Sequence, residues 1–115
     1  MMNEQEKLLE SNALEYYRNG LAAEKRGEYN TSATLFFKAI ASLCDLQILQ
    51  DKGSFPSNHS ERFRILERDY SGLYLMIDKD FRLYQNSYRL KLDKNTSEVL
   101  KHDVEALFEK LRISF

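Results

Sequence analysis

A polar loop near the middle of the chain carries the first group of residues that could do chemistry. The segment Pro56–Arg62 places His59, Glu61 and Arg62 among small hydrogen-bonding side chains, directly before an expected helix. Free backbone N–H groups at a helix N-terminus attract anions, and His59 and Arg62 would stand beside them. Ordinary capping explains the same residues if Asn58 closes the helix and His59 packs on its rim. We favour capping and keep the anion site as the alternative.

A second polar cluster lies near the end of the next expected helix and contains Arg82, Tyr84, Tyr88 and Arg89. The two arginines are seven residues apart, so they project from one side of a helix. Arg89 follows Tyr88, and an arginine beside a tyrosine can stack on a nucleic-acid base and bind its phosphate. By position, however, both tyrosines also belong to the apolar stripe of the helix. We therefore expect them in the core, with their hydroxyls at its edge.

Common catalytic and metal-binding motifs are absent from the sequence. No GxxxxGK[ST], GxGxxG, HExxH, CxxC or GxSxG pattern occurs, so the usual NTPases, dinucleotide enzymes, zincins and serine hydrolases lose support. One cysteine and two histidines cannot assemble a zinc site. Cys44 falls on an apolar face, where a thiol packs as a small hydrophobe, and His102 stands just off an apolar stripe. We expect no metal, no cofactor and no catalytic residue.

Composition points to one ordinary domain, spanning residues 1–115, with a net charge of −1 and 43% hydrophobic residues. This balance gives no global electrostatic attraction to nucleic acid, so any contact with RNA or phosphate must be local. The N-terminus is acidic without an apolar core, and no apolar run approaches the roughly 20 residues of a membrane span. A single cysteine suits a reducing compartment. We expect a cytoplasmic protein without membrane contact.

The expected fold class is all-α, because glycine, proline and β-branched residues are few while Leu, Glu, Lys, Arg and Ala are common. Apolar residues recur at helical spacing in five segments. We expect helices over about 5–26, 31–50, 58–68, 72–92 and 96–111. Together they predict an antiparallel up-and-down helical bundle of four main helices plus one short helix, the third.

Local signals in the sequence mark several helix ends and one close contact. Gly27 is expected to stop the first helix, Asn30 to cap the second and Asn95 to cap the last. The buried stripe of the first helix should include Tyr16 and Gly20, and the glycine would let the second helix approach closely. The first two helices are therefore expected to form an antiparallel hairpin.

This hairpin comes close to the residue spacing of a tetratricopeptide repeat. The matching positions are Tyr16, Gly20, Gly27, Tyr29, Phe36 and Ala39. The match occurs once, and residues 60–115 hold no second copy, although such folds bury their faces by stacking several repeats. We therefore favour a simple hairpin, with a peptide-binding adaptor as an alternative.

The order of these pieces resembles a HEPN domain over roughly residues 8–111. The resemblance rests on the hairpin segments Tyr29–Ala33 and Phe36–Ile40, on the helix start Asn58–Ser60 and on the helix end Ser87–Arg89. HEPN domains are prokaryotic helical bundles that are often encoded beside minimal nucleotidyltransferases. The resemblance implies a helical bundle, a homodimer and a nucleotidyltransferase-like partner, and it carries over residue by residue to Arg89, Tyr88 and His59.

The diagnostic catalytic piece of that family is missing from this sequence. Catalytic HEPN domains carry an arginine followed after a short gap by a histidine, and two such pairs meet across a dimer to cleave RNA. After Arg89, no histidine arrives until His102. Metal-free cleavage needs a group that exchanges a proton near neutral pH, which Lys and Asp do poorly. The departure argues against ribonuclease activity.

Three hypotheses follow for the function. The first is a non-catalytic HEPN-like module, a homodimer that binds a nucleotidyltransferase-like partner, a nucleotide or RNA. The second is a divergent metal-independent ribonuclease or nucleotide-processing enzyme in which His59 and Arg89 come together in space. The third is the tetratricopeptide-like adaptor. The ligand-binding candidates are His59, Glu61, Arg62, Arg82, Tyr88 and Arg89.

Overall fold

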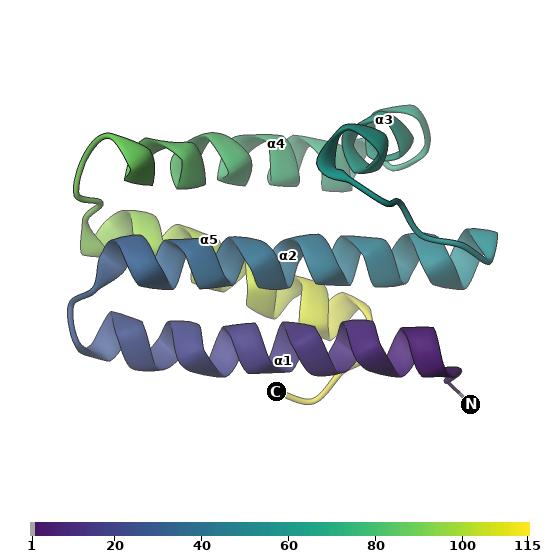
Figure 1. The fold of residues 1–115 in the computed structure, drawn as a ribbon, viewed down its shortest axis with the longest axis horizontal. Helices are drawn as coiled ribbons and strands as arrows, with labels where there is room; N and C mark the ends of the chain where they lie inside the picture. The colour runs from purple at the N-terminus through teal and green to yellow at the C-terminus, as the bar shows by residue number, and fades with distance from the viewer. Residues whose placement is uncertain (1) are drawn as a thin grey trace.

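Helices make up nearly all of the structure, a computed structural model that describes residues 2–115. The helices are α1 (Glu4–Lys25), α2 (Tyr29–Lys52), α3 (His59–Asp69), α4 (Ser71–Gln85) and α5 (Lys94–Lys110), with a 3₁₀ turn η1 (Asn86–Tyr88) after α4. In Figure 1, α2 and α5 run in the direction opposite to α1 and α4, and α3 is seen almost end-on as it crosses them. The predicted all-α, up-and-down bundle of four main helices and one short one is confirmed.

The α1–α2 hairpin forms through the expected glycines. Gly27 follows α1 with φ of 75°, a left-handed conformation that glycine adopts without strain. Gly20 lies so close to α2 that an added Cβ would stand 2.6 Å from Cε1 of Phe36. Two details of the prediction are wrong: α1 buries Tyr17 rather than Tyr16, and α2 begins at Tyr29 without a side-chain cap, so Asn30 is not its N-cap.

α2 is the central helix of the bundle. It contacts α1, α4 and α5, and its buried residues include Phe36, Phe37 and Ile40. Cys44 is fully buried here as predicted, and burial, reinforced by Asp45, raises the pKa of its thiol to about 12. Contrary to the sequence-based expectation, α2 is long and apolar enough to span a membrane, but 72% of the apolar window is buried inside the bundle.

The helix starts in the second half of the chain were predicted with mixed success. Asn58 caps α3 as expected, since its Oδ1 accepts a hydrogen bond of 2.9 Å from the N–H of Glu61. Asp93 rather than Asn95 caps α5, accepting from the N–H of Thr96 at 2.9 Å. The helix expected over 72–92 ends at Gln85. The turn η1 and a segment without regular structure follow it before α5 begins.

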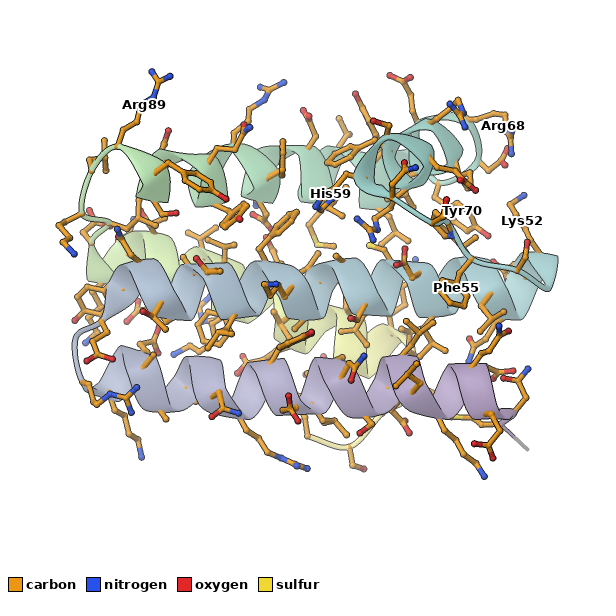
Figure 2. All side chains as sticks on the ribbon, in the orientation of Figure 1. Lys52, Phe55, His59, Arg68, Tyr70 and Arg89 are labelled. Carbon is orange, nitrogen blue, oxygen red and sulfur yellow. The ribbon has the colours of Figure 1, made fainter. Side chains whose placement is uncertain are left out.

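The end of the bundle where α2 meets α3 and α4 is fastened by polar contacts (Figure 2). Nζ of Lys52 lies 2.9 Å from Oδ2 of Asp69, and the hydroxyl of Tyr70 donates to Asp51 at 2.7 Å. These contacts join the last turn of α2 to the α3–α4 corner. The candidate site lies at the opposite end, which Arg89 marks in Figure 2.

Candidate ligand-binding site

The side chain of Asn30 on α2 holds the connection between α4 and α5 through hydrogen bonds to its backbone. Its Nδ2 donates to the carbonyl oxygens of Ser87 at 3.2 Å and Leu90 at 3.1 Å. Its Oδ1 accepts from the N–H of Leu92 at 2.7 Å. One amide group therefore forms three hydrogen bonds to the backbone of residues 87–92, which gives this segment a defined shape.

Tyr88 projects from this connection into solvent. The residue is 74% exposed, so the expectation that Tyr88 belongs to the core is wrong. The cause is the end of α4 at Gln85: the turn η1 rotates Tyr88 away from the stripe that helical spacing would give it. Tyr84 stays on the bundle, where its ring stacks on Phe37 at 5.1 Å. The two tyrosine hydroxyls are 2.7 Å apart, which holds the exposed ring in one orientation.

Three open hollows adjoin one another around η1. One of about 410 Å³ is lined by Gln85, Asn86, Tyr88 and Arg89. The second, of about 310 Å³, shares Tyr88 and Arg89 and extends to Lys91. The third, of about 370 Å³, lies between the α1–α2 turn and Lys91. The exposed ring of Tyr88 therefore lines two of the three hollows at this end of the bundle.

The charge around these hollows is locally basic although the chain is nearly neutral. Arg89 and Lys91 are exposed, and within residues 2–115 neither side chain forms an ion pair. Arg82 differs, because its guanidinium lies 2.8 Å from Asp78 one turn earlier on α4. The combination of an exposed aromatic ring with unpaired cations suits a base and its phosphate.

The polar loop candidate is occupied by its own partners. Arg62 is buried and binds Asp45 through two hydrogen bonds, Nε to Oδ1 at 2.7 Å and Nη2 to Oδ2 at 2.9 Å. Glu61 accepts from the hydroxyl of Ser57 at 3.0 Å. The positive charge expected to attract an anion is thus neutralised by a residue of α2, which agrees with capping as the role of this segment.

His59 is oriented by the same ion pair. Its Nδ1 lies 2.7 Å from Nη1 of Arg62, and because arginine only donates, Nδ1 accepts and the proton sits on Nε2. The ring lies against Phe37 and Phe81, with centroids 6.2 Å and 5.7 Å away. Burial and the charge of Arg62 lower the pKa of His59, so the ring is neutral at neutral pH.

His59 and Arg89 do not come together. Figure 2 shows His59 beside α3 and Arg89 at the far end of α4, beyond η1. His102, the other histidine, is exposed on α5. Of the predicted site residues, the structure thus gathers Tyr88 and Arg89 at one end, leaves Arg82 along α4, and places His59, Glu61 and Arg62 at the start of α3.

Sequence reasoning missed two residues of the η1 end. Lys91 carried no motif, because an isolated lysine in a polar segment has no distinguishing neighbour. Asn30 was assigned to a cap, since a single sequence does not show that its partners lie about sixty positions away. Comparison with known proteins adds no relative: no family model matches the chain, and neither a curated protein nor a solved structure is significantly similar to it.

Proposed function

We propose that this chain is a non-catalytic binding module that holds single-stranded RNA or a nucleotide at the η1 end of the bundle. The observation that carries the proposal is the exposed ring of Tyr88, hydrogen-bonded to Tyr84 and flanked by Arg89 and Lys91, which form no ion pair with any of residues 2–115. A base would stack on the free face of the ring, and its phosphate would meet the two cations. Every base offers such a face, so sequence preference is expected to be weak.

Within residues 2–115, no histidine lines the three hollows, which supports a binding role over a cleaving one. Around the hollows of the described chain the ionisable side chains are arginine, lysine and tyrosine, with Glu28 at the margin. The histidine proposed as a general base, His59, begins α3 and hydrogen-bonds to Arg62, far from Arg89 at the other end of α4. The divergent-enzyme alternative therefore lacks the geometry it requires.

The adaptor alternative also lacks support in the packing. It needs a concave groove between α1 and α2, but Phe36 fills that interface against Gly20 and is fully buried. The resemblance to HEPN domains remains the source for a homodimer and for a nucleotidyltransferase-like partner. Sedimentation of the purified chain tests the first. Recovery of such a partner from the native host after ribonuclease treatment tests the second.

The experiment for the binding site is fluorescence anisotropy with a labelled single-stranded RNA oligomer, repeated with a labelled nucleotide. Tyr88→Ala should weaken binding about 5- to 150-fold, because one stacked base is worth about 1–3 kcal/mol. Arg89→Ala should also weaken it and should reduce the dependence on salt. The matched control is Arg82→Ala, which removes another exposed arginine, one that lies outside the hollows, and should leave binding unchanged. Equal losses in Arg82→Ala and Arg89→Ala would mean nonspecific charge attraction and would overturn the assignment.

A further inference from the structure

Asp80 is a fully buried carboxyl group whose oxygens accept no hydrogen bond. It lies on α4, on the same face as the buried Leu73 and Ile77. Neither of its oxygens has a hydrogen-bond partner, and Oδ2 of Asp103 on α5 is also buried, with an ion pair to Lys79 but no well-directed hydrogen bond. A buried polar group normally has a partner, since leaving one unpaired costs free energy. The burial of the Asp80 and Asp103 carboxyl groups beside each other therefore requires a physical explanation.

The groups around Asp80 come from three helices. From α4, Nζ of Lys79 lies 3.1 Å from Oδ2 of Asp103 and 3.7 Å from Oδ1 of Asp80. From α5, Asp103 lies against the same ammonium group as Asp80, which brings the two carboxyl groups to one lysine Nζ. From α2, the titratable group nearby is the thiol of Cys44. Two carboxyl groups thus face one ammonium group, and the Lys79 side chain is itself 52% exposed and partly hydrated.

A shared proton accounts for these contacts better than a metal ion does. Two carboxylates cannot donate to each other, whereas a protonated Asp80 can donate to Asp103 and so pair one oxygen of each carboxyl group. Within residues 2–115 no group of three or more metal-ligating side chains exists here or elsewhere. We propose that Asp80 and Asp103 share one proton, that the pair fastens α4 to α5, and that loss of the proton releases α4 from α5.

The pair makes folding stability depend on pH in a defined direction. Burial and the hydrogen bond with Asp103 raise the pKa of Asp80 to about 9 from the ordinary value of 3.8. Between these values the folded chain holds a proton that the unfolded chain has lost. Its contribution to stability is complete below about pH 4 and is lost progressively as the pH rises to about 9.

The direct test follows the carboxyl carbon of Asp80 by NMR in the unaltered chain, together with the methyl groups of Ile77 on α4 and Val104 on α5. The expected result is a carboxyl midpoint near pH 9 with methyl shifts at the same midpoint. Titration of Asp80 in the ordinary acid range would refute the shared proton. A high midpoint without methyl shifts would refute the release of α4.

Urea unfolding across the same pH range gives an independent measurement. The unfolding free energy of the unaltered chain should fall relative to that of Asp80→Asn as pH rises from about 4 to about 9, because the amide cannot ionise. Asp103→Asn serves as a second variant, and it should also lessen the fall. The matched control is Asp78→Asn, whose carboxylate pairs with Arg82 on the outer part of α4. Its profile should follow that of the unaltered chain, and a fall that persists in Asp80→Asn and Asp103→Asn would overturn the proposal.

Discussion

Replacing Arg62 with methionine should destabilise the fold strongly, although Arg62 was also a candidate for binding a ligand. The side chains of Arg62 and Asp45 are only 11% and 8% exposed, and two short hydrogen bonds join them. Removing the arginine leaves the Asp45 carboxylate buried without a counter-charge. Loss of one partner of a buried ion pair costs about 3–5 kcal/mol, a large part of the stability of a small domain.

Urea denaturation at pH 7 measures this loss, and two further variants interpret it. The double variant Asp45→Leu/Arg62→Met removes both charges, so it should regain most of the stability that Arg62→Met loses. Arg82→Met breaks the exposed pair with Asp78 and should cost about 0.3–0.5 kcal/mol, as a helical surface pair does. The contrast separates the effect of burial from the loss of an arginine as such.

The pH dependence of Arg62→Met gives a second check on the same reasoning. Burial raises the pKa of Asp45, and Arg62 opposes that rise through its hydrogen bonds and charge. Without Arg62 the pKa should rise further, so the variant should recover relative stability as the pH falls and the carboxyl takes up a proton. A loss under about 1 kcal/mol in Arg62→Met at pH 7 would refute the buried pair and restore Arg62 as a free ligand-binding residue.

Two further predictions concern packing and the candidate site. Gly20→Ala should lower the unfolding free energy measured in urea by about 1–3 kcal/mol, because the new Cβ meets the buried ring of Phe36, and the better helix propensity of alanine offsets up to about 1 kcal/mol of that loss. Gly72 has open space around it, so Gly72→Ala should be neutral or stabilising. Equal effects of the two substitutions would contradict the close contact at Gly20. Asn30→Ala should cost about 2–3 kcal/mol for three lost hydrogen bonds, and hydrogen exchange should show weaker protection at the Leu92 amide, which an unchanged exchange rate would disprove.

The parts of the fold that the sequence predicted are those determined by neighbouring residues. Gly27 ends α1 and Asn58 caps α3 through contacts within one turn of the chain, so spacing alone identifies them. Asp93 and Asn95 are both suitable caps, and the structure uses the earlier one because its side chain reaches Thr96. Local signals thus give the element and its approximate end, while a choice between adjacent caps depends on backbone geometry.

The candidate site was predicted less completely because its geometry depends on distant residues. Arg62 looked free because its partner Asp45 lies on the preceding helix, 17 residues earlier. Tyr88 looked buried because the helical stripe was extended past the point where α4 ends. The adjacency of Tyr88 and Arg89 is a property of the sequence itself, whereas the exposure of Tyr88 was not predicted. The hollows themselves depend on how Asn30 holds the 87–92 segment.

Because Cys44 is buried, its reaction with a thiol reagent can report when α2 separates from the rest of the bundle. It is the sole cysteine, it lies fully inside the α2 core, and the pKa of its thiol is raised to about 12. Thiol reagents attack the thiolate, so they should react only with molecules in which α2 has separated from its neighbours. The rate of thiol labelling therefore measures how often α2 separates from its neighbours, without a fluorescent tag or an added probe residue. Changes to any helix that covers α2 can be ranked on this one scale.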